Sequence, residues 1–282
     1  MEDKRDEIRQ LIEDTKSLPT LPTVITKLNA LVARKNSTNQ EIARVISSDQ
    51  ILSAKVLRLV NSPFYGFSRR VSTVSNALIL LGVNVIKSLI LSTSIFEMME
   101  KNLVGLWEHS MATAVASNVI ATRMNLPDKE EVSTAGLLHD IGKIVIRIYL
   151  NNDVDRIAAL AEEKGIPNYE AERLILGTDH SEVGKWLSES WLLPEKLIEP
   201  IACHHDVAKS VNHRHHTAIV HFANILVEAR GMGHGGAAGV PSIQDAAKEA
   251  LKLSNDDLEA IIANLEDKLV EVRNFSMDIQ DT

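Results

Sequence analysis

Apolar residues recur at helical spacing along most of the chain, and the alternation typical of strands is scarce. Near the N-terminus, Ile8, Leu11 and Ile12 stand three and four residues apart among charged residues, which predicts a short amphipathic helix over residues 3–16. A proline-containing break over residues 17–23 interrupts the pattern before it resumes. We therefore expect an almost all-α protein.

Capping residues and glycines divide the rest of the chain. Thr38 and Glu41 have the spacing of a capping box, Asp49 is placed to cap the helix that follows it, and Gly82 is predicted to be a hinge. A Gly-rich segment, residues 231–239, is predicted to be a loop or linker. The predicted helices are residues 22–31, 42–47, 51–60, 72–81, 83–99, 106–124, 130–138, 154–163, 169–176, 180–190, 195–205, 243–251 and 256–275.

Composition narrows the functional classes. The chain has 282 residues, 45% of them apolar, and a formal net charge of -8, which argues against a dedicated DNA-binding protein. From Ile51 to Phe96 there is no Asp or Glu but five Lys or Arg residues, which we interpret as a partner surface in preference to an anion site. A single cysteine, no apolar leader and no long apolar run predict a soluble cytoplasmic protein without a membrane partner.

The candidate chemistry centres on His139 and Asp140, an adjacent pair inside an apolar run. Burying an unpaired carboxylate costs several kcal/mol, so a cation should lie beside it. Further histidines at helix-like positions are His109, His180, His204 and His205. Imidazoles with a carboxylate that can bridge two cations suit Zn, Fe or Mn better than Mg or Ca, and they predict a mononuclear or dinuclear transition-metal centre.

The first part of the chain resembles the N-terminal part of the HDOD family. The matching phrases are Leu18-Pro19-Thr20-Leu21-Pro22, Ile46-Ser47-Ser48-Asp49, Leu57-Arg58-Leu59-Val60-Asn61-Ser62, Ala77-Leu78 and Leu81-Gly82. This resemblance implies a helical half, residues 1–100, packed against an HD-like metal-capable bundle, residues 101–230, with the linker and terminal helices in residues 231–282. It also implies a role in bacterial signalling or regulation.

His139-Asp140 followed by Gly142-Lys143 resembles the signature of the HD superfamily of metal-dependent phosphohydrolases, which includes the HD-GYP phosphodiesterases. Lys143 stands where that family keeps a lysine. The metal ligands that this resemblance implies are His109, His139, Asp140, His180, His204 and His205, with Asn224 at the position of the final Asp.

Three departures argue against cyclic-dinucleotide hydrolysis by the HD-GYP route. The amide of Asn224 adds no negative charge, Gly105 replaces a glutamate of the HD-GYP pattern, and residues 206–210 replace the Gly-Tyr-Pro phrase. Glu108 cannot replace that glutamate, because adjacent helical residues point about 100° apart.

The remaining candidates receive other roles. His221 shares a helix face with Asn224 and is a candidate for an outer position, whereas Cys203 is interpreted as a small buried residue and not a nucleophile. The histidines predicted to be solvated are His213, His215, His216 and His234.

Three functions stay open. The first is a regulatory module that can bind metal and whose output is binding of a signalling protein or a nucleotide-like ligand. The second is a metal-dependent phosphohydrolase of a nucleotide or phosphate ester, in which Asp140 bridges two cations, water is the nucleophile and Lys143 stabilises the developing phosphate charge. The third is a scaffold with a dry histidine cluster.

Overall fold

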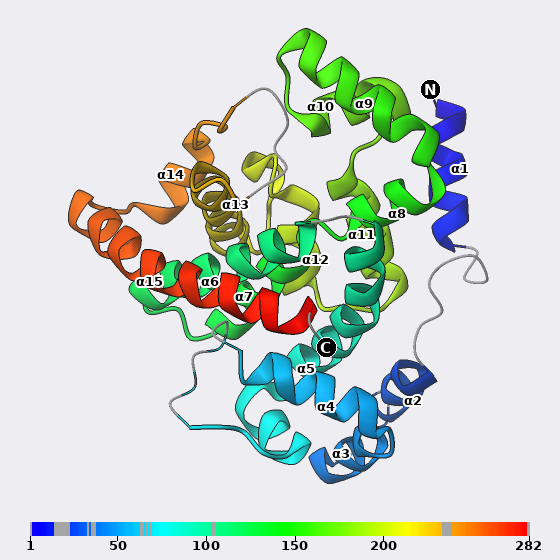
Figure 1. Ribbon diagram of the computed structural model, residues 1–282, viewed down its shortest axis with the longest axis vertical. Coiled ribbons are helices and arrows are strands. Elements are labelled where there is room, and N and C mark those ends of the chain that lie inside the picture. The colour runs from blue at the N-terminus through cyan, green and yellow to red at the C-terminus, as the bar shows by residue number, and fades with distance from the viewer. Residues whose placement is uncertain are drawn as a thin grey trace.

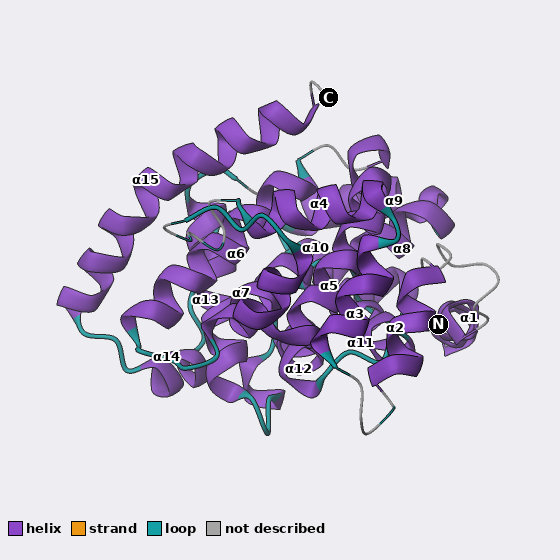
Figure 2. Cartoon of the chain, turned by 90° about the horizontal axis from the view of Figure 1, so that it is seen from below, coloured by secondary structure: helices purple, strands orange, loops and turns teal. Residues whose placement is uncertain are grey.

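The computed structural model describes residues 2–13, 23–32, 34, 38–62, 65, 67, 69–102, 105–232 and 239–280. Within these ranges the regular structure is helical throughout, without a strand, so the predicted all-α class is confirmed (Figure 2). The Leu18–Pro22 phrase and His234 lie outside the described residues.

The helices follow one another with short connections. They are α1 (Glu2–Glu13), α2 (Thr23–Val32), α3 (Asn39–Ser47), α4 (Gln50–Val60), α5 (Val74–Asn102), α6 (Leu106–Arg123), α7 (Lys129–Leu138), α8 (Gly142–Tyr149), α9 (Asn151–Lys164), α10 (Asn168–Leu176), α11 (His180–Ser190), α12 (Glu195–Cys203), the 3-10 turn η1 (Val207–Lys209), α13 (Arg214–Ala229), α14 (Asp245–Leu251) and α15 (Asn255–Gln280). Helix α8 was not predicted, and α13 was implied only by the helix face that His221 and Asn224 share, without predicted bounds.

The predicted caps and the hinge are confirmed. The Thr38 side chain accepts a hydrogen bond from the Glu41 amide at 3.2 Å, and the Glu41 carboxylate accepts one from the Thr38 amide at 2.9 Å. Asp49 accepts from the Leu52 amide at 3.0 Å and caps α4. Gly82 kinks α5 with φ 77° and ψ 164°, a conformation that residues with a Cβ rarely adopt.

Helix α5 joins the N-terminal helices to the middle of the molecule. Figure 1 shows α2, α3 and α4 at one end and α9 and α10 at the other, with α6, α7, α11, α12 and α13 between them. Helix α5 packs against α2, α3 and α4 and also against α6, α7 and α8. None of the described helices combines the length and the apolar character needed to cross a membrane.

Small residues on α6 let its neighbours approach closely. Ala112, Ala114, Ala116 and Ala121 are fully buried on this helix, which packs against α7, α13 and α15. Gly136 of α7 is part of the same contact, because an added Cβ would lie 2.6 Å from the Ser117 hydroxyl and 3.0 Å from a backbone oxygen of α6. This close packing fixes the distance between the helices that carry His109 and His139.

Helix α1 lies against the later part of the chain (Figure 1). Lys4 pairs with Asp153 at 2.6 Å and Arg5 pairs with Glu182 of α11 at 2.6 Å. The fully buried Ile12 anchors the end of α1 in the core. The N-terminal helix thus supports the element that begins with His180.

Candidate metal centre

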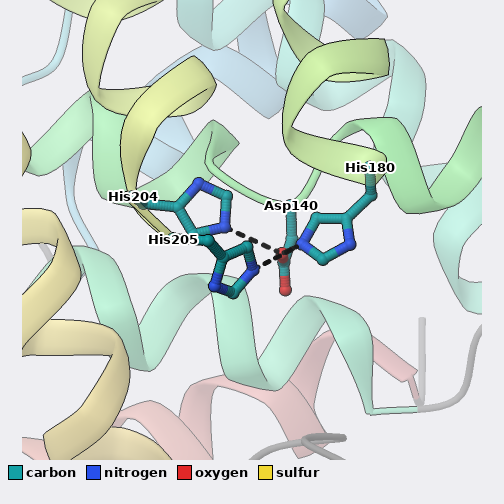
Figure 3. A group of neighbouring side chains, drawn as sticks. All are labelled: Asp140, His180, His204 and His205. Carbon is teal, nitrogen blue, oxygen red and sulfur yellow. Dashed lines mark hydrogen bonds and ion pairs between the residues drawn. The ribbon is translucent and has the colours of Figure 1, made fainter. Parts of the chain in front are cut away.

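Helix ends bring the predicted ligands together in the interior. His109 lies in the first turn of α6, His139 and Asp140 form the turn between α7 and α8, and His180 begins α11. His204 and His205 directly follow α12. Apart from the partly exposed His205, these side chains are buried, and Figure 3 shows His180, His204 and His205 around Asp140.

Gly142 brings the α7–α8 turn against α11. A Cβ at this position would lie 2.0 Å from the His180 carbonyl oxygen and 2.7 Å from the Gly184 amide nitrogen. Only a residue without a side chain allows these two backbones to touch. The contact sets the Nε2 atom of His180 3.2 Å from Oδ1 of Asp140.

The two oxygens of Asp140 face different histidines. Oδ2 lies 3.4 Å from Nε2 of His109 and 3.3 Å from Nε2 of His139. Oδ1 lies 3.2 Å from Nε2 of His180 and 3.8 Å from Nε2 of His204. We call His109, His139 and Asp140 the His109 group, and Asp140, His180, His204 and His205 the His180 group. Within each group the potential ligand atoms lie within 4.8 Å of one another.

Backbone carbonyls fix the tautomers of three of the rings. In each, Nδ1 lies at hydrogen-bond distance from a carbonyl oxygen, so it carries the proton and leaves the Nε2 lone pair directed at the cluster. The acceptors are Met232 for His109 at 2.7 Å, Gly136 for His139 at 2.7 Å and Ile201 for His204 at 2.8 Å.

Lone pairs that face one another require a cation between them. Nε2 of His109 and Nε2 of His139 are 3.2 Å apart, and Nε2 of His204 has no hydrogen-bond partner among the described residues. A proton on one ring or a metal ion between the rings would remove the repulsion. Ligand atoms that share a metal at about 2.1 Å lie roughly 3.0 to 3.4 Å apart, which is the spacing found in the His109 group.

Glu172 orients His180. Its carboxylate accepts hydrogen bonds from Nδ1 and from the backbone amide of His180, both at 2.7 Å. Burial lowers the pKa of His180, but the charge of Glu172 and the hydrogen bonds to Asp140 and Glu172 together outweigh burial and raise that pKa to about 9. A carboxylate that holds the far nitrogen of a histidine is the usual support of a metal ligand. The sequence did not reveal Glu172, because nothing in its spacing separates it from Glu170, the partly exposed glutamate of the same helix.

Lys143 forms an ion pair with the carboxylate of Asp140. Its Nζ atom is 2.7 Å from Oδ2 of Asp140, and its side chain is 21% exposed. Burial raises the pKa of Asp140, but His139 and Lys143 outweigh burial and hold that pKa well below its ordinary range. Asp140 is therefore ionised, and Lys143 and His205 are the cluster members nearest to solvent.

Asn224 takes a different contact from the one expected. It is buried on α13, and its amide nitrogen donates to Oε1 of Glu228 at 3.2 Å. Among the described residues no hydrogen bond joins it to Asp140 or to a histidine, and its Oδ1 atom has no hydrogen-bond partner.

Gln244 and His221 support the His204–His205 turn from outside. Nδ1 of His221 donates to the His204 carbonyl at 2.7 Å, and the Gln244 side chain donates to the His205 carbonyl at 2.7 Å. Gln244 also accepts from the Val207 amide at 2.8 Å. The ring of Tyr169 stacks on His205 with centroids 4.1 Å apart.

Other candidates lie away from the cluster. The prediction of a solvated His216 was wrong, since it is buried on the inner face of α13, 3.2 Å from Asp128. His215 is exposed and His213 is partly exposed. Burial raises the pKa of Cys203 to about 11, so its thiol stays protonated at neutral pH. Glu108 pairs with Arg273 at 3.6 Å.

The donor set fits a transition metal. Imidazole nitrogens in a fixed tautomer and a buried carboxylate are ligands of Zn, Fe and Mn. The Oδ1 atom of Asp140 and the Nε2 atom of His204 accept no hydrogen bond from the described residues. The cluster could therefore hold a metal ion, and the geometry leaves the identity of that ion open.

A family model and a curated relative match this chain. The family model described as HDOD domain matches residues 18–207. An uncharacterised protein of Treponema pallidum (strain Nichols) is 23% identical over 217 residues, which cover 74% of this chain and 42% of the relative's length. The chain thus spans about two fifths of the curated relative that it matches.

Solved structures with the same fold include three bacterial proteins. An HDOD domain protein with unknown function from Geobacter sulfurreducens is 28% identical, with 97% of each chain covered and a TM-score of 0.73. A candidate phosphohydrolase from Shewanella amazonensis SB2B is 22% identical, with 95% of this chain and 97% of that chain covered and a TM-score of 0.71. A candidate signal transduction protein from Marinobacter aquaeolei VT8 is 20% identical, with 96% and 64% covered and a TM-score of 0.71.

Proposed function

The chain belongs to the HDOD family, and from that premise we propose that it is a signalling or regulatory protein whose histidine cluster binds a divalent transition metal. The convergence of Nε2 lone pairs on an ionised, buried Asp140 carries the proposal. His109 and His139 would hold one cation, and His180, His204 and His205 another, with Asp140 between them. Fe, Mn and Zn are the candidate ions.

Binding, and not turnover, is the proposed output. All the proposed ligands except His205 are buried, and the neutral amide of Asn224 lowers the negative charge available to a cation. Metal occupancy would join α6, the α7–α8 turn, α11 and the end of α12, and such a cross-link stabilises one arrangement of the helices. A bound metal would also provide a Lewis acid in the core.

Metal content tests this proposal. Purified full-length protein, stripped with a chelator and reconstituted separately with Fe²⁺, Mn²⁺ or Zn²⁺, should retain up to about two ions per chain. His139→Ala should lose metal, because it removes a buried donor, whereas His215→Ala should retain it, because His215 is exposed. A wild-type chain that retains none of the three metals would refute the proposal.

A regulatory role also needs a partner, and we propose an anionic one that binds at α4. Arg58 and Arg70 line a surface hollow of about 900 Å³ together with Phe67, within the stretch that lacks acidic residues. An acidic protein surface or a nucleotide-like ligand would fit this charge. Titration with nucleotides should give weaker binding to Arg70→Glu than to wild type, and equal binding to both would remove this hollow as the site.

The second candidate function is a metal-dependent phosphohydrolase acting on a nucleotide or phosphate ester. The observation that favours it is the contact between Lys143 and a carboxylate whose two oxygens face separate histidine groups. In this reaction Lys143, the partly exposed cation of the cluster, would stabilise the developing charge on the phosphate. Proteins described as candidate phosphohydrolases share the fold.

Asn224→Asp separates the two candidates. If the centre is a weakened enzyme, the added carboxylate should raise the rate of phosphodiester or phosphomonoester hydrolysis by the metal-loaded protein. Metal binding without turnover in both proteins would support the regulatory function.

A further inference from the structure

We propose that Glu228 is a metal ligand of the His109 group and provides the negative charge that Asn224 lacks. The proposal rests on the proposed metal-binding function and adds a residue outside the stretch that matches the HDOD family model. Sequence reasoning did not include Glu228 among the ligands.

The position of Glu228 on α13 directs it to the right part of the cluster. It lies four residues after Asn224, so the two side chains share one face of the helix. Helix α13 packs against both α6 and α7, which carry His109 and His139. Four residues after Glu228, the carbonyl oxygen of Met232 lies 2.7 Å from Nδ1 of His109, so the segment at the end of α13 lies beside that ring, and the charges of His109, Lys143 and Asp140 act on the buried Glu228 carboxylate.

The hydrogen bonds of Glu228 leave one oxygen for another partner. Oε1 accepts from the Asn224 amide nitrogen at 3.2 Å, whereas Oε2 is buried and has no hydrogen-bond partner among the described residues. The amide must turn its nitrogen to the carboxylate, which leaves Oδ1 of Asn224, a side chain 5% exposed, equally without a partner. Two buried acceptor oxygens without partners thus lie one helical turn apart on α13.

A purely structural role does not account for this carboxylate. Arg230, the nearest cation along α13, pairs with Glu266 of α15 at 2.6 Å. Buried carboxylates are normally neutralised by an ion pair or by several hydrogen bonds, and the described residues give Glu228 a single neutral donor. In this structure no oxygen of Glu228 lies within 4.8 Å of the ligand atoms of both His109 and His139, so the Glu228 side chain would turn toward a cation held by those two rings, and the cation would satisfy Oε2.

The balance of charges in the cluster also favours Glu228 as a ligand. Asp140 is the one carboxylate that both histidine groups contact, and Lys143 already compensates part of its charge. Divalent ions in both groups would leave a large excess of positive charge in the core, which is costly. Glu172 offsets that excess at His180, and Glu228 would offset it at His109.

The test measures metal binding directly. Chelator-treated full-length protein is titrated with Mn²⁺ alone, and the sites are followed by calorimetry and by the electron paramagnetic resonance of free and bound Mn²⁺. Glu228→Gln keeps the shape of the side chain but removes its charge, so we expect at least a tenfold loss of affinity at one site. Glu266→Gln is the matched control, because it removes the same charge from an exposed position nearby and should bind as wild type does.

A second substitution that restores metal affinity distinguishes a ligand role of Glu228 from a packing role. In Glu228→Gln, adding Asn224→Asp places a carboxylate one turn earlier on the same face and should restore most of the lost affinity. A residue that only packed against its neighbours would not be replaced in this way. If Glu228→Gln does not fold by circular dichroism, Glu228→Asp, which keeps the charge, provides the comparison and should bind Mn²⁺ more tightly than Glu228→Ala.

The outcomes distinguish this inference from the function on which it rests. A wild-type chain that binds no Mn²⁺, Fe²⁺ or Zn²⁺ would overturn both. A wild-type chain that binds Mn²⁺ with an affinity unchanged by Glu228→Gln would overturn the ligand assignment alone. Selective loss at one site with rescue by Asn224→Asp would establish it.

Discussion

Replacing Gly142 with alanine should separate α8 from α11 and disrupt the candidate metal centre. The added Cβ would lie 2.0 Å from the His180 carbonyl oxygen and 2.7 Å from the Gly184 amide nitrogen. An ordinary nonbonded contact to carbon needs about 3.5 Å. Because both contacts are to backbone atoms, the two helices must move apart by roughly 1 Å or more.

Two losses follow from this displacement. Overpacking a dense core costs about 1 to 3 kcal/mol. Gly142→Ala belongs at the upper end of this range, because both atoms that the new Cβ would meet are backbone atoms. We therefore expect the free energy of unfolding to fall by about 3 kcal/mol. The same movement takes Nε2 of His180 away from Oδ1 of Asp140, which are 3.2 Å apart, so metal affinity should fall by at least about tenfold.

Chemical denaturation of the metal-free protein measures the first loss, with the fluorescence of the buried Trp186 and Trp191 as the signal. Metal titration measures the second. Gly184→Ala is the control on the facing helix, since its Cβ would meet side-chain atoms of Ile201 at 3.0 Å and Ile141 at 3.3 Å, which can rotate. Equal stability of the two variants, or undiminished metal affinity in Gly142→Ala, would refute the reasoning.

Three further predictions concern the surroundings of the centre. Gln244→Ala should weaken metal binding several-fold by releasing the His205 carbonyl, as measured by titration, and unchanged affinity would show that the turn holds without it. Glu199 is buried, which raises its pKa, but hydrogen-bond donors of the following loop outweigh burial and lower that pKa. The ionised Glu199 therefore stabilises the fold above its unfolded pKa of about 4.3, and this stabilisation is lost as pH falls through the folded pKa. Glu199→Gln should lower the free energy of unfolding by about 2 kcal/mol at neutral pH and by little in acid. Denaturation experiments that give the same loss at both pH values would contradict this. Lys143→Met should increase Mn²⁺ affinity because the ammonium at 2.7 Å competes for Asp140, and weaker binding would count against that competition.

Residues whose chemistry is rare on a helix were the easiest to predict. His109, His180 and the His204–His205 pair stood out because they recur at helix-like positions and match the HD pattern around His139-Asp140, and the structure brings them together around Asp140. Their occupation by metal stays a prediction.

The supporting carboxylates could not be predicted. Glu172 and Glu228 lie on amphipathic helices where glutamate is common, and only the packing of α10 and α13 shows that they face inward. His216 was assigned to solvent because its sequence neighbours are polar, yet the rotation of α13 turns it to Asp128. Helix α8 was missed because a short apolar run does not distinguish helix from strand.

The supports of the centre extend beyond the stretch that defines the family. Residues 18–207 contain every imidazole of the cluster, but Asn224, Glu228 and Gln244 lie downstream. A chain truncated after residue 207 would keep the five rings yet leave the alanine face of α6 without α13. Such a fragment should be prone to aggregate, and the shortest autonomous unit of this protein should reach at least the end of α14.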